Sequence, residues 1–325
     1  MGRYALKRLA IAIPTFLFIT LVTFLVVNLG PGDPALSASS LGGDALVSAE
    51  ARARARAQWG LEGPLLVRYG HWLSRCVQLD FGRSLHDGQA VLTKLAHRAW
   101  PTMALAAVAL LAALAVAIPA GVHAATHAGG WFDRATALVC FGLSAVPRYV
   151  MGMALIVIVG VHLGWLPFMG LSGVDAPENA PWGRLVDVLR HGVLIGVCFA
   201  YPLAAYLTRF VRDNVASVLS SDYIRTAYAL GASRRRVLYR HALPNALLPL
   251  FTVLGLMIPA ILSGAVILEV MFSWPGMGRL MYDAVMQRDY PVILGASAVT
   301  AVFVLVATLI VDLLYAVIDP RARCR

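Results

Sequence analysis

Long uncharged stretches of apolar residues recur along this chain. A helix needs about 20 predominantly apolar residues to cross the roughly 30 Å hydrocarbon core of a bilayer. The stretches that approach or exceed this length are 9–29, 103–122, 135–161, 193–208, 247–268 and 292–311. This pattern predicts an all-α membrane protein with six transmembrane helices.

Prolines interrupt several of these stretches. The third is longer than one span requires and is broken by Pro147 and Arg148, and the short fourth contains Pro202. The fifth contains Pro249 and Pro259. These prolines do not argue against helices, because neighbouring helices in a bundle can satisfy the backbone carbonyls that a proline leaves free.

The first stretch follows a basic start formed by Arg3, Lys7 and Arg8. A cleaved signal peptide has an apolar core of about 7–15 residues and a small-residue cleavage site. This stretch is longer and has no such site, so we interpret it as an uncleaved first span.

Composition leads to the same class of protein. The chain is 59% hydrophobic and 14% charged, whereas a soluble domain is about 45–50% apolar and about 25% charged. A soluble enzyme and a disordered chain are therefore excluded. The four cysteines fit neither a zinc site nor a disulfide framework, because no CxxC motif or nearby His/Cys cluster exists; they are Cys76, Cys140, Cys198 and Cys324.

The net charge of +10 has an uneven distribution. Basic residues gather at both ends of the chain and between the fourth and fifth stretches, where they are Arg209, Arg212, Arg225, Arg234, Arg235, Arg236 and Arg240. Only Asp213 and Asp222 oppose them there. With six spans these three segments share one side, which the positive-inside rule assigns to the cytoplasm. The segment between the first two stretches is also basic, but long loops cross the membrane largely regardless of charge.

The outer segments contain several recognisable features. The turn-forming residues at 30–34 are expected to end the first helix. The sequence of residues 45–59 predicts an Arg-rich helix, which is either solvated or in contact with lipid headgroups or a partner. Residues 61–83 mix aromatic and apolar side chains, which indicates an interfacial or folded element. A second outer loop is expected at 164–190, and a third at 271–290, whose aromatic side chains we expect at the membrane interface.

The sequence contains few motifs for catalysis or cofactor binding. No P-loop for ATP is present, and neither H-E-x-x-H nor G-x-S-x-G occurs. His123 and His127 have the i,i+4 spacing of some metal ligands, but no convincing third ligand accompanies them. We therefore expect no catalytic residue, no metal site and no cofactor.

Two charged residues interrupt or end apolar stretches. If Arg148 faced lipid at mid-membrane, the free energy of inserting its helix would rise by roughly 2.5–3.5 kcal/mol. Arg148 should therefore face a cavity or a partner. Glu269 ends the fifth stretch and is a candidate partner. Two interpretations stay open: either Arg148 lines a pathway and meets an anionic group, or it forms a structural ion pair or extends to water near a helix break.

The segment 222–245 is the most informative part of the chain. Residues 223–230 suit a short helix, Gly231 can supply a left-handed stop, and Ser233 is a reasonable N-cap for a second helix. Pro244 marks the start of the fifth span. Two helices joined at a glycine would project from the basic side, and such a projection suits docking into a groove of another protein. The alternative is a charged connecting loop.

This segment resembles the EAA loop of bacterial ABC importer permeases. Gly231 corresponds to the loop glycine and Leu243-Pro244 to its later Leu-Pro, while Arg225-Thr226-Ala227 is similar to the Arg-Thr-Ala form of the peptide-transporter branch. Other segments similar to that branch are 30–34, 61–69, 80–85, Glu269 with 272–279, and 319–321. Over most of its length the chain resembles the first (B-type) permease subunit of dipeptide, oligopeptide and nickel importers. Arg148 departs from this pattern, since an apolar or aromatic residue usually follows that proline.

The resemblance implies a set of partners and sites. The partners are a second similar permease, two ABC ATPase subunits, a periplasmic or lipid-anchored substrate-binding protein and membrane lipids, with no nucleic acid. The implied ATPase-coupling residues are Tyr223, Arg225, Thr226, Ala227, Leu230, Gly231, Ser233, Arg234, Leu243 and Pro244. The pathway residues are Arg148 and Glu269. The segment that joins the fifth span to the sixth, called the outer connection, contains Phe272, Trp274, Pro275, Gly276 and Gly278.

The expected organisation is an inner tail with the first span at 1–30, a periplasmic segment at 31–98, a permease core at 99–318 and a cytoplasmic tail at 319–325. The substrate would be di- or oligopeptides or a related small solute, imported across the bacterial inner membrane with ATP hydrolysed by partner chains. A nickel-complex importer, an intramembrane enzyme and a non-transporting membrane scaffold are the alternatives. No His- or Cys-rich path favours nickel, and the uncharged spans lack paired catalytic groups.

Overall fold

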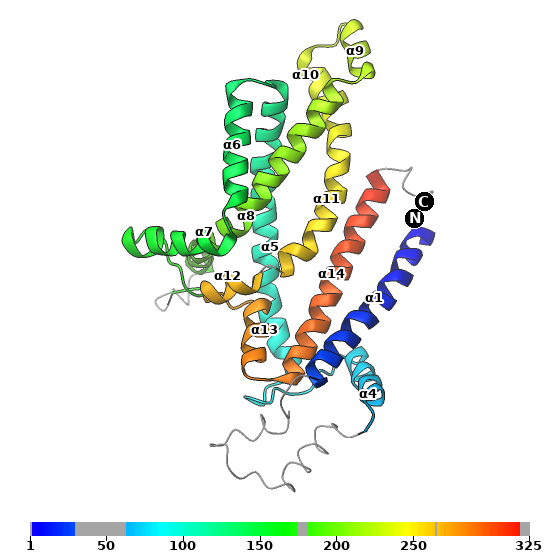
Figure 1. Cartoon of the computed structure of the whole chain (residues 1–325), viewed down its shortest axis with the longest axis vertical. Helices are drawn as coiled ribbons and strands as arrows, with labels where there is room; N and C mark the ends of the chain where they lie inside the picture. The colour runs from blue at the N-terminus through cyan, green and yellow to red at the C-terminus, as the bar shows by residue number, and fades with distance from the viewer. Residues whose placement is uncertain (1, 30–62, 174–180, 264, 319–325) are drawn as a thin grey trace. The chain divides into compact units, whose positions relative to one another are not determined.

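The computed structural model describes residues 2–29, 63–173, 181–263 and 265–318, and its described elements are helices joined by turns and loops (Figure 1). The helices are α1 Gly2–Leu29, α4 Leu65–Val77, α5 Val91–Thr126, α6 Trp131–Ala145, α7 Arg148–Leu155, α8 Pro181–Leu219, α9 Asp222–Ala229, α10 Arg234–Arg236, α11 Leu243–Ser263, α12 Ala265–Met271, α13 Met277–Met286 and α14 Tyr290–Ile318. Two π-helical segments, η1 Ile156–His162 and η2 Val237–Ala242, continue α7 and α10. The predicted helical fold class is confirmed.

Four helices in the described residues are long and apolar enough to span a membrane: Arg8–Leu29, Val91–Thr126, Pro181–Leu219 and Tyr290–Leu313. A fifth follows if α6 and the α7–η1 segment form one span. Helix α11 occupies the predicted fifth stretch, but its side chains are described only as far as Met257. Six spans therefore remain a prediction.

The third stretch is not one straight helix. Helix α6 ends at Ala145, α7 begins at Arg148, and the two directions differ by 93°. Val146 and Pro147 lie between them with extended backbone angles, and this conformation of Val146 is expected because proline disfavours a helical conformation at the residue before it. The predicted break is therefore present, and it is sharper than a proline kink within one span.

Helices extend into segments that were predicted as loops. Helix α8 begins at Pro181 and continues past Pro202 to Leu219, so it replaces the end of the expected outer loop and the start of the expected inner one. The third outer loop contains helix α13. The features expected at 30–34, 45–59 and 319–321 lie outside the described residues, as do 61–62 and 174–180.

The chain divides into two compact units, and each is described by itself. The first unit contains 103–274 and 307–325, and the second contains 2–102 and 275–306. In the first unit, α6, α7, α11 and α12 all pack on α8. Its apolar core is formed chiefly by α5 and α8.

A stripe of small residues lies on the buried face of α5 and reaches α8 at Gly121. Ala109, Ala113 and Ala117 are buried at successive i,i+4 positions, and Gly121 continues the spacing. A Cβ added to Gly121 would lie 2.7 Å from the carbonyl oxygen of Thr208. Small residues at such spacing allow helix backbones to pack tightly in membranes.

The second unit joins α4 to α1 and the 78–90 segment to α14. The hydroxyl groups of Tyr69 and Thr20 lie 2.9 Å apart, and the Tyr69 ring contacts Phe24 edge-on. The side chain of Asp289 accepts hydrogen bonds from the Ser84 hydroxyl and from the backbone N–H of Leu85 at 3.1 Å. Lys94 lies beside this contact and pairs with Asp87 at 2.7 Å.

Candidate functional site: a projecting helical loop

The loop that follows α8 folds as two helical pieces around a glycine. Helix α9 ends at Ala229, and Gly231 has φ +82°. The N–H of Ala232 donates to the carbonyl of Ala227 at 3.1 Å, and the N–H of Gly231 donates to Tyr228 at 2.9 Å. This pair of bonds is a Schellman C-cap. The predicted left-handed stop is confirmed.

The second piece differs from the expected helix. Ser233 precedes α10 but makes no side-chain capping hydrogen bond, and its carbonyl accepts from the N–H of Val237 at 2.9 Å. Three residues of α10 lead into the π-helical segment η2, after which α11 begins at Leu243. Pro244 provides no N–H for a bond four residues back, and a π-helical turn is one way in which a helix accommodates such a loss.

A small apolar core makes this loop a folded element. Ile224, Val237 and Ala242 are fully buried, and Ala227 and Ala232 pack against them. Val218 and Leu219 at the end of α8 complete the cluster. Ile224 and Val237 were not predicted as site residues, although apolar residues within a strongly basic loop were the available signal.

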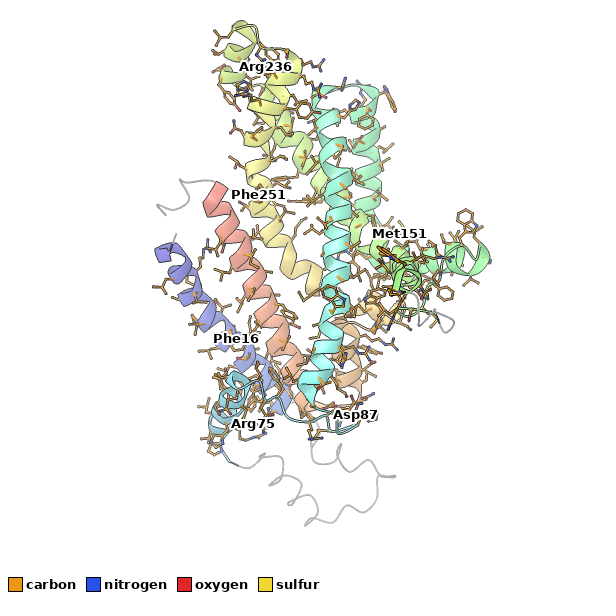
Figure 2. The ribbon with its side chains drawn as sticks, turned by 180° about the vertical axis from the view of Figure 1, so that it is seen from behind. Phe16, Arg75, Asp87, Met151, Arg236 and Phe251 are labelled. Atoms are coloured by element: carbon orange, nitrogen blue, oxygen red, sulfur yellow. The ribbon has the colours of Figure 1, made fainter. Side chains whose placement is uncertain are left out.

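The outer surface of the loop is apolar at its tip and cationic around it. Leu230 is 83% exposed beside the glycine turn, and Tyr223, Tyr228 and Tyr239 are also exposed. The surrounding arginines are Arg225, Arg234, Arg235, Arg236 and Arg240. Figure 2 shows Arg236 at the end of the first unit away from Met151 of α7. The surface suits a groove with an apolar floor and an acidic rim.

Other predicted residues of the loop have local roles. The hydroxyl group of Thr226 donates to the carbonyl of Asp222 at 3.1 Å, and Arg225 forms a long, exposed pair with Asp222 at 3.4 Å. The Asn245 amide donates to the Tyr223 hydroxyl at 3.2 Å, which joins α9 to the start of α11. The structure therefore brings Tyr223 close to the Leu243-Pro244 end of the loop.

The loop also contacts the turn between α5 and α6. The Arg234 Nη2 donates to the carbonyl of Thr126, the last residue of α5, at 2.7 Å. Beyond that turn, Arg212 of α8 holds both carboxylate oxygens of Asp133. Neither contact was predicted, because the partners are 108 and 79 residues apart in the sequence.

Arg148 and Glu269 lie on helices that pack together. Arg148 is the half-buried first residue of α7, and Glu269 of α12 is fully buried. One turn after Arg148, Gly152 contacts α12 closely, since an added Cβ would lie 2.3 Å from the Met271 methyl carbon. The Tyr201 hydroxyl of α8 donates to the Val146 carbonyl at the bend, at 2.6 Å. The pathway role of both charged residues remains a prediction.

The aromatic residues of the outer connection are buried, and their position at the membrane interface stays a prediction. Phe272 and Trp274 are only 1% and 4% exposed and belong to the core of the first unit. The Trp274 ring lies against Gly192 of α8, which has no side chain to obstruct it. Gly276 and Gly278 are also buried, whereas Pro275 is partly exposed, and Gly276 directly precedes α13.

The described residues contain no group of three or more His, Cys, Asp or Glu side chains positioned to hold a metal ion. The rings of His123 and His127 lie 4.4 Å apart at the end of α5, and the His127 Nδ1 is 3.0 Å from the His123 carbonyl oxygen. The projecting loop, with its exposed apolar tip and surrounding arginines, is the candidate site considered below.

Comparison with known proteins identifies relatives over the whole length. Residues 117–323 match the family described as binding-protein-dependent transport system inner membrane component, and residues 1–106 match the N-terminal region of such membrane components. The chain is 38% identical over 322 residues to the oligopeptide transport system permease protein AppB of Bacillus subtilis, covering 99% of each chain.

Two further relatives and one solved structure extend the comparison. The chain is 37% identical to the dipeptide permease DppB and 35% identical to the glutathione permease GsiC of Escherichia coli K12, with 99% of each chain covered. An inward-facing structure of the MetNI methionine ABC transporter has a TM-score of 0.53 at 14% identity, covering 70% of this chain and 97% of that one. This last likeness concerns the fold alone.

Proposed function

The chain belongs to the family of binding-protein-dependent transport system inner membrane components, and on this premise we propose that it forms half of a pathway for short peptides. It is a multi-pass permease subunit of a bacterial ABC importer. The relatives are named as oligopeptide, dipeptide and glutathione permeases. We infer di- or oligopeptides, or a closely related small solute, as the substrate.

The projecting loop is the observation that carries the mechanism. It is a folded unit with its own core, an exposed Leu230 at its tip and several arginines around it. Because the core joins the loop to the end of α8, and η2 continues into α11, a displacement of the tip would move both helices. We infer that residues 222–245 dock in a groove of an ATPase subunit and transmit its movement to the permease.

The division of labour follows from the sequence and the family. A permease of this kind works with ATPase subunits and a substrate-binding protein. The chain has no P-loop, so ATP would be hydrolysed by the partner subunits. We propose one similar permease and two ATPases as partners, with both termini in the cytoplasm and a binding protein delivering substrate outside.

The turn at Gly231 provides the test. No heavy atom lies within 4 Å of an added Cβ, so a substitution there would act through the positive φ and not through crowding. Gly231→Val should raise the cost of this conformation by about 1–2 kcal/mol, whereas Asn tolerates it better. The complete importer should be reconstituted in vesicles, and peptide uptake per ATP hydrolysed should be measured.

In the expected result, Gly231→Val uncouples ATP hydrolysis from uptake, and Gly231→Asn keeps most of the coupling. Unchanged uptake in correctly assembled Gly231→Val importer would refute docking through this loop. A wild-type complex that retains ATPase subunits but takes up no peptide would refute the substrate assignment instead.

A further inference from the structure

We propose that Arg234 is a positioning residue that transmits movement of the projecting loop to the α5–α6 turn. This inference rests on the proposed function of the loop. The structural basis is the hydrogen bond from the Arg234 guanidinium to the carbonyl oxygen of Thr126, at 2.7 Å. It links the docking element to a helix pair that is distant from it in the sequence.

The acceptor is a favourable one for a cation. Thr126 ends the 36-residue helix α5, and the last four carbonyls of a helix have no partner within the helix. Its carbonyl oxygen lies at the negative end of the helix dipole, where an arginine both donates a hydrogen bond and neutralises charge. Such charge-assisted bonds are shorter and stronger than neutral ones.

The donor belongs to the rigid part of the loop. Arg234 follows the Schellman turn directly, and the next turn contains the buried Val237. The backbone bond between Ala232 and Ala227 fixes α10 relative to α9. A displacement of α9 is therefore transmitted to the Arg234 side chain without a flexible linker between them.

The receiving turn is also rigid. Its Gly129 N–H donates to an Asp133 carboxylate oxygen at 2.9 Å, and the same carboxylate is held by Arg212 of α8. Asp133 lies in the first turn of α6, and α6 packs along α8. At its far end, α6 reaches the 93° bend before Arg148. A push at Thr126 therefore acts on a helix that leads to the bend.

Two other polar side-chain contacts of the loop stay within it. Arg225 pairs with Asp222, and Asn245 bonds to Tyr223. Arg235 is exposed and adjacent to Arg234 on α10, so it carries the same charge at nearly the same place. Arg235→Ala is consequently a matched control that separates the Thr126 contact from the general positive charge of the loop.

The test uses the complete importer, purified through a tag on this chain and placed in vesicles with binding protein loaded from a labelled mixture of short peptides. Three quantities are measured: the ATPase subunits retained, basal ATP hydrolysis, and peptide uptake per ATP. Arg234→Ala should lower uptake per ATP about tenfold, the scale set by one charge-assisted hydrogen bond, while it loses no more of the ATPase subunits than Arg235→Ala does. Arg234→Lys should recover part of the loss, and Arg235→Ala, which removes one charge of the docking surface but leaves the Thr126 bond, should lower uptake per ATP less than Arg234→Ala does.

A second readout is independent of transport. Hydrogen exchange at the backbone amides of residues 123–130 should be faster in Arg234→Ala and unchanged in Arg235→Ala, because only the former releases the end of α5. Arg234→Gln serves if the alanine variant does not accumulate in the membrane.

Two results would overturn the inference. Equal behaviour of Arg234→Ala and Arg235→Ala would mean that the Thr126 contact has no special role. Loss of the ATPase subunits in Arg234→Ala alone would mean that Arg234 contacts the ATPase directly. Failure of the proposed function is distinguishable, because in that case the wild-type complex itself would neither retain ATPases nor take up peptide.

Discussion

Arg212 of α8 holds Asp133 of α6 through two parallel hydrogen bonds, from Nε to Oδ1 at 3.0 Å and from Nη2 to Oδ2 at 2.8 Å. The carboxylate also accepts the N–H of Gly129 from the α5–α6 turn. This one side chain therefore joins α8 to the start of α6 and to the turn before it. Planar, bidentate recognition of this kind is the strong form of an arginine–carboxylate pair.

Removing the charge of Asp133 should destabilise this junction. In Asp133→Asn the guanidinium loses one charged acceptor while it stays partly buried, so the free energy of unfolding should fall by about 1–3 kcal/mol. Arg212 also pairs with Asp213, whose side chain is 65% exposed compared with 11% for Asp133. Asp213→Asn is therefore the control and should change stability by less than about 0.5 kcal/mol. Thermal unfolding in detergent measures both, and equal losses would contradict the prediction.

The close contact of α5 with α8 predicts a strong effect at Gly121. An added methyl group would meet the Thr208 carbonyl oxygen at 2.7 Å and Val211 at 2.9 Å, and the backbone atom cannot move aside without shifting a helix. Gly121→Ala should therefore lower the free energy of unfolding by about 1–3 kcal/mol, as overpacking does. Gly142→Ala is a matched change in α6, where the added Cβ has open space, and its stability should be unchanged or slightly raised. Similar melting temperatures of the two variants would contradict this prediction, because they would show that α5 and α8 can move apart at little cost.

Arg148 is expected to act on transport more than on assembly. It begins α7 at the bend, is half-buried, and lies one turn from the close contact of Gly152 with α12. Arg148→Ala should lower peptide uptake by about tenfold, the value of one hydrogen bond to a charged group. The amount of assembled importer should be unchanged, and Arg148→Lys should keep more uptake than Ala. If Arg148→Ala instead prevents assembly, the residue is structural.

The outer 78–90 segment should give a pH-dependent contribution to stability. The Gly82 N–H and the Arg75 guanidinium hold the pKa of Asp80 below its ordinary value. For Asp87, burial alone would raise the pKa, but hydrogen bonds, chiefly from Lys94, outweigh it and leave the pKa lowered. A carboxyl whose pKa is lower in the folded state stabilises the fold above its unfolded pKa of about 3.9, and this contribution is lost as the pH falls through the folded value.

Thermal unfolding of the wild type and Asp80→Asn between pH 7 and pH 3 checks this sign. The wild type should be the more stable protein above a pH of about 5, and the difference should shrink below about 4. A difference that stays constant across this range would show that Asp80 stabilises the segment by shape or hydrogen bonding and not by charge.

Local features of this protein were predictable where one short stretch of sequence controls them. The apolar stretches predicted helices, and Gly231 predicted the left-handed stop, because only neighbouring residues decide those conformations. Pro147 likewise predicted the break before Arg148. The exact extent of α8 was not predictable, since Pro202 is tolerated inside it and charged residues lie at both of its ends.

Contacts between distant residues were not predictable from one sequence. Nothing in the sequence pattern distinguishes Arg234 from Arg235. In the folded structure the Arg234 guanidinium bonds to the carbonyl group at the end of α5. The same holds for Phe272 and Trp274, which have the composition of an interfacial segment but are buried in the core of the first unit.

The sequence by itself therefore determined the membrane class, the helical stretches and the glycine-centred loop, because hydropathy and backbone preference act over a few residues. The tertiary structure alone decided the 93° bend between α6 and α7, the burial of the outer connection and the bond from Arg234 to Thr126. These depend on which helix faces which, and that choice is made by packing and by hydrogen bonds between residues far apart in the chain.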